Sequence, residues 1–168
     1  MLKRVDGPEW AKIMLEWEEE ADNFGENFGD HAPATLPLLE DLAHQPNYKQ
    51  SAVFAFDHQN KTIAVLQANH TFLPGFKGKV LRIRHLLFSP GLELDDKFTI
   101  EDYKQFLADI LLAVIDLTQN EMPTDDIKFH MRSRAEIVFT QFFAQKVKER
   151  GIFDVVNTHG AWIHLSKT

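Results

Sequence analysis

The sequence predicts an α/β domain with a mixed, mostly antiparallel central sheet flanked by helices. Apolar residues recur at helical spacing in residues 8–22, after Thr99 and in 134–149. Between residues 51 and 88, three apolar stretches are separated by short polar or glycine-containing connections, as in antiparallel strands. An apolar segment between the last two helices, 126–131, predicts a buried strand parallel to its neighbour. These elements occur without a linker or low-complexity segment, so residues 1–168 are expected to form one domain.

Composition excludes several classes of protein. The chain has no cysteine, so disulfides, thiolate metal sites and a cysteine nucleophile are excluded. The N-terminal residues contain no apolar stretch of the secretory kind, and the longest apolar run, 106–117, is too short for a membrane span. We therefore expect a cytoplasmic protein that makes no membrane contact. The net charge of −7 opposes binding to a phosphate backbone, so nucleic acid is not an expected partner, although a small anionic ligand remains compatible with it.

The first half of the chain has clear start and stop signals. Residues 2–5 predict a short strand, and Asp6 with Glu9 predicts a capped start for the helix over 8–22. We expect its buried face to consist of Trp10, Ile13, Met14, Trp17 and Ala21. Thr35 and Pro37 indicate a second short helix over 36–44. Three strands follow, joined by a tight connection at 58–61 and by a turn at 73–78. In the third strand, 79–88, alternation places Arg82 and Arg84 on one face and His85 on the other.

The second half continues with helices and short strands. Thr99 and Asp102 predict a helix cap, and the apolar positions after it run to Val114. The helix over 134–149 is expected to bury Val138, Phe139, Phe142, Phe143 and Val147. Two strands, 152–156 and 161–166, separated by "NTHG" at 157–160, are expected to close the sheet.

The stretch "HLLFSPGLELDDKFTIEDY" at 85–103 raises the main functional question. An apolar strand runs into Ser89-Pro90-Gly91, and an acidic loop precedes a helix. A strand, a glycine turn and a helix start often hold a phosphate, because backbone amides there point at the anion. In this chain the loop contains Glu93, Asp95 and Asp96, whose charges oppose a phosphate.

The order of elements over nearly the whole chain resembles that of the GNAT (GCN5-related N-acetyltransferase) superfamily. "LLFSP" at 86–90 is similar to the end of the family's fourth strand, and "RAEIVFTQFF" at 134–143 to the segment after its fifth. The resemblance implies acetyl-coenzyme A held where these two strands splay apart. It implies contacts from Leu87, Phe88, Ser89 and Gly91, with Lys97 as a nearby cation and Phe139 against the cofactor sulfur.

Two features depart from the family pattern. The glycine-rich loop that the family places after the fourth strand is reduced here to Gly91. Many family members also carry a tyrosine after the fifth strand that protonates the leaving thiolate. The matching positions here are Phe139 and Phe143, which have no proton to donate.

An amine nucleophile needs a base before it attacks a thioester. His85 and Glu93 are the candidate catalytic residues, although His85 reads equally well as a core histidine and Glu93 as a solvated carboxylate. No histidine pair has metal-site spacing and no Gly-x-Ser-x-Gly motif occurs, so we expect neither a metal nor a serine hydrolase.

Two functions remain open. One is acyl transfer from acyl-coenzyme A to a small-molecule or protein amine, with acetyl-coenzyme A as the cofactor. The other is a GNAT-like fold without acyl transfer that acts as an interaction or small-molecule-binding module. For the second, a homodimer joined through strand edges or the first helices is one expected arrangement.

Overall fold

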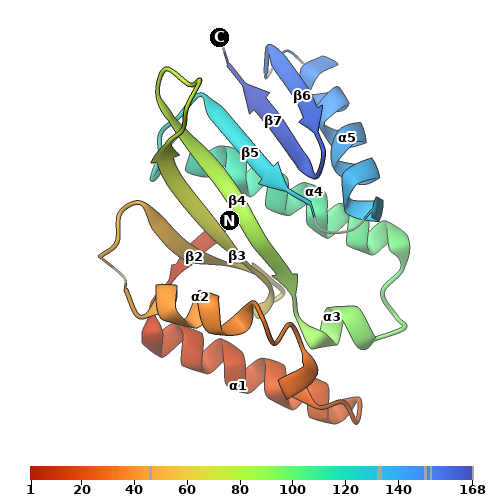
Figure 1. Cartoon of the computed structure of the whole chain (residues 1–168). Coiled ribbons are helices and arrows are strands. Elements are labelled where there is room, and N and C mark those ends of the chain that lie inside the picture. The colour runs from red at the N-terminus through yellow and green to blue at the C-terminus, as the bar shows by residue number, and fades with distance from the viewer. Residues whose placement is uncertain (46, 132–133, 150, 152, 168) are drawn as a thin grey trace. The chain divides into compact units, whose positions relative to one another are not determined.

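A computed structural model describes residues 1–45, 47–131, 134–149, 151 and 153–167, without the side chains of Arg134, Ala135 and Lys146 (Figure 1). Its elements, in chain order, are β1 (Leu2–Val5), α1 (Gly7–Asn23), the 3-10 turn η1 (Phe28–Asp30), α2 (Leu36–Ala43), β2 (Ser51–His58), β3 (Lys61–Phe72), β4 (Lys79–Phe88), α3 (Pro90–Leu94), α4 (Ile100–Leu117), β5 (Asp126–His130), α5 (Arg134–Glu149), β6 (Val155–His159) and β7 (Trp162–Ser166).

The seven strands form one sheet in the order β1-β2-β3-β4-β5-β7-β6. β4 and β5 pair in parallel, whereas the pairs β1–β2, β5–β7 and β6–β7 are antiparallel. The predicted mixed, mostly antiparallel sheet is confirmed, as is the parallel placing of the strand that begins at Asp126. No helix in the described part of the chain is both long and apolar enough to cross a membrane.

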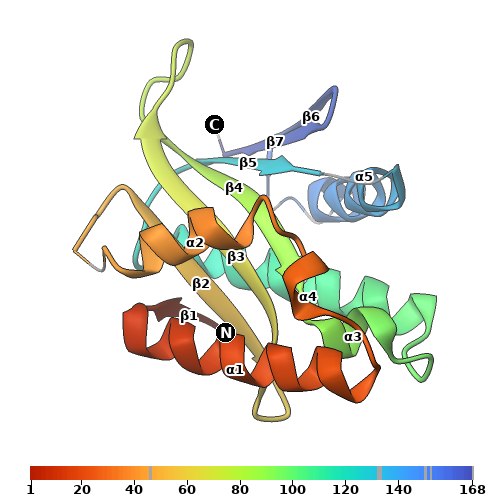
Figure 2. The ribbon, with the colours of Figure 1, turned by 60° about the horizontal axis from the view of Figure 1, so that its bottom comes forward.

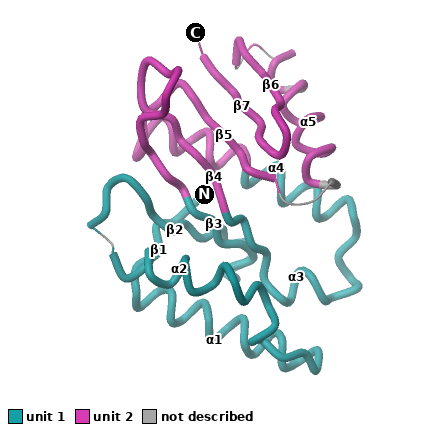
Figure 3. Tube along the Cα trace, in the orientation of Figure 1, with its two compact units in different colours: residues 1–67, 85–110 teal, residues 68–84, 111–168 magenta. Residues whose placement is uncertain are grey.

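Contacts divide the chain into two compact units (Figure 3). Unit 1 comprises residues 1–67 and 85–110, and unit 2 comprises residues 68–84 and 111–168. β3, β4 and α4 each contribute residues to both units, so each unit contains only part of them. The prediction of a single domain stays a prediction.

Unit 1 is organised around α1. Asp6 caps the helix by accepting a hydrogen bond from the Glu9 amide at 2.9 Å, as predicted. α1 and α2 lie together on one face of the unit 1 strands (Figures 1 and 2). Trp10 and Trp17 are both fully buried between this helix pair and the sheet, and the Trp17 indole donates to the Thr62 carbonyl at 2.8 Å. The indole therefore joins the middle of α1 to the start of β3.

The hairpin between β2 and β3 turns on two residues. Gln59 and Asn60 have φ angles of 50° and 63°. Positive φ at both central residues is the type I′ geometry, whose twist matches that of the flanking strands. Asn60 suits this conformation, and the predicted tight connection at 58–61 is confirmed.

In unit 2 the strands bury one face. Leu81, Ile127 and Phe129 are almost fully buried, as are Ile163 and Leu165 of β7. Among the side chains of α5 that the structure describes, those of Thr140, Ala144 and Val147 are buried. The predicted core face of this helix was therefore wrong at Val138 and Phe142, which are 60% and 61% exposed. Because both residues are apolar, the sequence pattern placed the buried face of α5 part of a helical turn away from its actual position.

The closing hairpin also differs from its prediction. β6 runs through Asn157 and Thr158 to His159, so "NTHG" is strand except for its last residue, and Gly160 makes the turn with φ of 57°. The predicted strand start at Ile152 lies outside the described residues. Thr35, expected to start α2, makes no side-chain capping bond, and Pro37 in the first turn supplies the start signal.

The Trp17 hydrogen bond can be tested by substitution. We expect Trp17→Phe to lower the free energy of unfolding by about 2–4 kcal/mol, because it leaves a cavity and an unpaired buried carbonyl at Thr62. Trp10→Phe is the matched control. That indole is buried on the same helix and has no hydrogen-bond partner among the described residues. Urea unfolding measures both variants, and equal losses would show that the hydrogen bond contributes nothing.

Candidate functional site at the end of β4

The chain after β4 is more ordered than the sequence predicted. Pro90–Leu94 form the short helix α3, so the acidic loop expected directly after Gly91 was wrong in its first half. Ser89 caps this helix: its hydroxyl accepts from the Leu92 amide at 3.2 Å, and Pro90 occupies the first turn. Serine followed by proline is a common helix start, and this signal at 89–90 could have revealed α3.

The backbone amides of this junction all have partners within unit 1. The Ser89 amide donates to the Ile63 carbonyl at 2.9 Å, and the Glu93 amide donates to the Ser89 carbonyl at 3.1 Å. The Gly91 amide donates to the Glu20 carboxylate at 2.9 Å. Glu20 belongs to α1, 71 residues earlier in the chain. A negatively charged oxygen thus lies on the amide that the sequence assigned to a phosphate.

The Glu20 carboxylate lies close to the Cα of Gly91. A Cβ added at this position would lie 2.7 Å from Cδ and Oε2 of Glu20. Contacts that short are repulsive, so a larger residue would force the carboxylate away. The carboxylate is the end of a flexible side chain and could move aside, so its approach does not by itself require a glycine at this position.

His31, from the segment after η1, lies against the same strand end. Its Nε2 is 3.1 Å from the Phe88 carbonyl, and because a carbonyl only accepts, Nε2 donates. Its Nδ1 lies 3.7 Å from the Glu93 carboxylate. Burial lowers the pKa of His31, while the Phe88 carbonyl and the charge of Glu20 act in the opposite direction.

The predicted cluster of three acids is dispersed. Glu93 lies beside His31, and Asp95 accepts from the Lys97 amide at 3.0 Å. Lys97, the predicted cofactor cation, is 87% exposed and its ammonium is 3.6 Å from Asp95. The acid that occupies the junction is Glu20, from the acidic run 16–22 that otherwise looks like a solvated helix face.

His85 lies just beyond the point where the pairing of β4 with β5 ends. The ladder between β4 and β5 ends at the pair Ile83–Phe129, and His85 follows with φ of 52°. This is a left-handed conformation that is uncommon outside glycine. This left-handed residue interrupts the extended backbone and with it the predicted alternation, and Leu87 and Phe88 beyond it are both buried. Phe88 packs on Tyr103 of α4 with ring centroids 4.4 Å apart.

The remaining predicted residue, Phe139, belongs to unit 2. It is partly buried and stacks with Phe143 at a centroid distance of 6.4 Å. The neighbouring Thr140 is buried, and its hydroxyl lies 3.0 Å from the Met131 sulfur. The structure describes no group of three or more histidine and acidic side chains that could hold a metal.

Comparison with solved structures identifies the fold. No protein-family model and no curated protein sequence matches the chain. An N-acetyltransferase from Staphylococcus aureus Mu50 is 11% identical, with a TM-score of 0.54 over 99% of this chain and 96% of that one. The chain has the GNAT fold. The aminoglycoside 6'-acetyltransferase type Ii is 9% identical, with a TM-score of 0.55 over the same two shares.

A third GNAT structure was solved with a ligand. The N-acetyltransferase PseH of Campylobacter jejuni, in complex with acetyl coenzyme A, is 11% identical with a TM-score of 0.51, and each chain is covered completely. The GNAT resemblance of the element order is thus confirmed at the level of the fold. Within unit 1, the structure brings Phe88, Ser89, Gly91 and Glu93 together and adds Glu20 and His31, which the sequence did not single out.

The lowered pKa of His31 predicts a pH-dependent stability. Above about pH 6.5 the histidine is neutral in both folded and unfolded chains. As the pH falls below that value, the unfolded chain binds the proton first, so stability is lost as the pH approaches the lower pKa of the folded state.

We expect the free energy of unfolding to fall less steeply in His31→Gln than in the natural chain from about pH 7.5 to about pH 5.5. A smaller slope remains because burial also lowers the pKa of His70 in unit 2. His159→Gln, which removes an exposed histidine, should leave the slope unchanged. Equal slopes in all three proteins, from urea unfolding at each pH, would contradict the assignment.

Proposed function

We propose that this chain is an acyltransferase-type protein that moves an acyl group from a coenzyme A thioester to an amine on a small molecule or a protein. The GNAT fold over the whole chain supports the reaction class, and the acetyl coenzyme A complex of a structural neighbour supports the cofactor. The observation that carries the proposal is the Gly91 amide, which binds an anionic oxygen at 2.9 Å.

If the Glu20 carboxylate moves away from the Gly91 amide, that amide could donate to one phosphate oxygen in its place. The Glu20 carboxylate stands in for that oxygen, because both are anionic acceptors that a backbone amide binds well. Leu87 and Phe88 would hold the pantetheine arm through their backbone, and Lys97 is exposed enough to turn toward a phosphate. Phe139 would contact the sulfur.

The chain's own groups would prepare the acceptor. The coenzyme supplies a thioester carbonyl, and the attacking amine must lose a proton. His85 is the proposed base, with Glu93 able to relay the proton through a water. Phe139 and Phe143 have no acidic proton, so the thiolate leaves without help from this position, and we expect slow transfer.

A second function is favoured by one observation. Each amide of the junction from Ser89 to Glu93 already has an acceptor within the chain. If Glu20 is a permanent occupant, the fold persists without coenzyme, as a non-catalytic interaction or small-molecule-binding module.

Removal of Glu20 separates the two functions. We expect Glu20→Ala to bind acetyl-coenzyme A at least about tenfold more tightly than the natural chain, because a charge-assisted hydrogen bond of ~1.5–3 kcal/mol no longer competes. Glu20→Gln should lie between them. Glu18→Gln, which removes an exposed acid from the same helix, is the matched control for net charge. Titration calorimetry gives the affinities.

Two further measurements complete the test. Release of free thiol in the presence of amine reports transfer, and His85→Gln should abolish it while leaving the affinity for acetyl-coenzyme A unchanged. Binding by neither the natural chain nor Glu20→Ala would reject the transferase and leave the binding module.

A further inference from the structure

One face of the unit 2 strands has an unusual row of side chains. The register places Arg82 of β4 opposite Lys128 of β5, and Lys128 opposite His164 of β7. The alternate residues, including Leu81, Ile127 and Leu165, are buried on the other face. In Figure 1, α5 and the unit 2 part of α4 lie behind these strands. The row therefore lies on the face away from those helices.

The tight turn at 73–76 places Leu73, Pro74 and Phe76 beside Arg82 and Lys128. The Phe76 amide donates to the Leu73 carbonyl at 3.3 Å, with Pro74 and Gly75 between them. Gly75 has φ of 86°, and proline followed by such a glycine is the type II β-turn. A residue with a Cβ would be strained at that position. The turn thus fixes where Phe76 lies.

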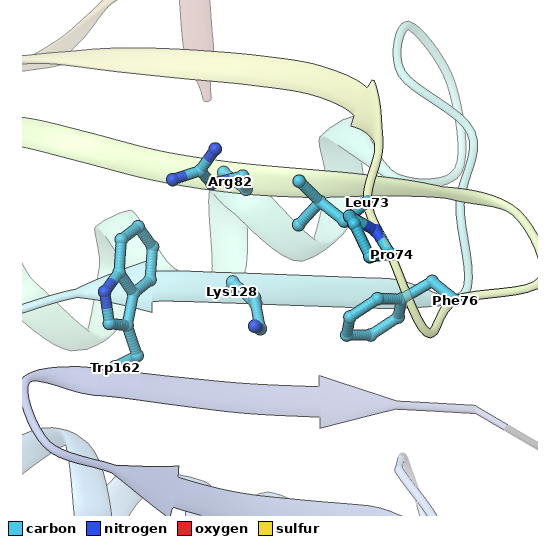
Figure 4. Close-up of a pocket in the computed structure, with 6 residues that line it drawn as sticks. All are labelled: Leu73, Pro74, Phe76, Arg82, Lys128 and Trp162. Atoms are coloured by element: carbon cyan, nitrogen blue, oxygen red, sulfur yellow. The ribbon is translucent and has the colours of Figure 1, made fainter.

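These side chains line an open pocket of about 300 Å³. It is lined by Leu73, Pro74, Phe76, Arg82, Lys128 and Trp162 (Figure 4). Figure 4 shows Trp162 and Phe76 at the two ends of the cavity with Lys128 between them. The Arg82 guanidinium lies 5.0 Å from the Trp162 ring centre, and the Lys128 ammonium lies 5.1 Å from that of Phe76.

The two cations have aromatic partners but no acidic ones. Among the described residues, neither Arg82 nor Lys128 forms an ion pair or a side-chain hydrogen bond. Asp126, on the same strand face as Lys128, instead contacts His164 at 2.8 Å. Asp125 and Asp126 line an adjacent cavity, so the nearby acids lie to one side of the pocket.

This arrangement has an electrostatic cost. Like charges directly opposite on neighbouring strands repel each other and destabilise the sheet. Burial and the neighbouring Arg84 also lower the pKa of Arg82, which shows that its surroundings disfavour the charged form. The chain has 25 acidic residues against 18 basic ones, yet none of its acids neutralises this pair within the described structure. An anion from outside would remove the repulsion and gain two charge-assisted contacts.

We propose that this pocket binds an aromatic anion, that is, an aromatic or heteroaromatic ring carrying a carboxylate or a phosphate. The anionic group would lie between Arg82 and Lys128, where a guanidinium can bind it in a bidentate manner. The ring would lie among Trp162, Phe76 and the apolar side chains of Leu73 and Pro74. The cavity is of the size that small ligands occupy.

The proposal does not depend on the acyltransferase function. Its residues all belong to unit 2, whereas Glu20 and Gly91 belong to unit 1. Loss of acetyl-coenzyme A binding would leave it standing.

Phenyl phosphate and benzoate are the probes, one for each type of anionic group. Inorganic phosphate supplies the charge without the ring, and benzyl alcohol supplies the ring without the charge. The indole N–H signals of the natural chain are followed by NMR during each titration. Trp10 and Trp17 are buried in unit 1, so their signals serve as internal references, and Trp162→Phe assigns the third.

We expect phenyl phosphate, benzoate or both to shift the Trp162 signal and to bind at least about tenfold more tightly than inorganic phosphate or benzyl alcohol, a difference of ~1.4 kcal/mol. Arg82→Gln and Lys128→Gln should each weaken that binding by about tenfold. Arg82→Lys keeps the charge and should lose less, which preserves the test if Arg82→Gln fails to fold. Lys148→Gln, an exposed lysine of α5, is the control.

Three results would overturn the proposal. The first is the absence of any shift of Trp162 with both ring-bearing anions. The second is unchanged affinity in Lys128→Gln together with either folded Arg82 variant. The third is equal binding of inorganic phosphate, which would leave the aromatic rings without a role.

Discussion

The hydrogen bond from the Gly91 amide to Glu20 links the parts of unit 1 that matter for function. Where a strand turns into a helix, the first amides of the helix have no acceptor within it and must find one elsewhere. Ser89 supplies one such acceptor through its side chain, and the β3 carbonyl of Ile63 supplies another to Ser89 itself. The Gly91 amide needs a third, and α1 provides it. The end of β4 is thus tied to α1 and β3 through its backbone.

The same junction explains how an acidic chain tolerates so many carboxylates near a strand end. The Asp95 carboxylate accepts from the Lys97 amide, which is a hydrogen bond within a local turn. Glu93 lies beside His31, whose ring also donates to the Phe88 carbonyl. The charges that would repel a phosphate are therefore dispersed or held by partners. The acid that directly occupies the Gly91 amide is Glu20.

Local sequence signals predicted much of the fold and little of this site. Asp6, the pair Thr99 and Asp102, and the polar connection at 58–61 act within a few residues, and the caps and hairpin appear where expected. The contacts of Glu20 and His31 span 71 and 57 residues, and no pattern in a single sequence encodes such a distance. On α5 the pattern misled, because Phe142 is apolar but exposed and buried Thr140 finds a sulfur partner.

The Gly91 amide and the pair Arg82 and Lys128 differ in the partners that the chain itself provides for them. A sheet face turned away from its helices needs polar side chains, and alternation alone would supply them. Solubility does not require two cations side by side, since acids are plentiful in this sequence and would serve equally well. At Gly91 a carboxylate of the chain itself accepts from the partly buried backbone amide. At Arg82 and Lys128 it places aromatic rings beside the cations instead, and a ring attracts a cation without neutralising its charge. Both side chains therefore keep their positive charge, as the proposed anion site requires.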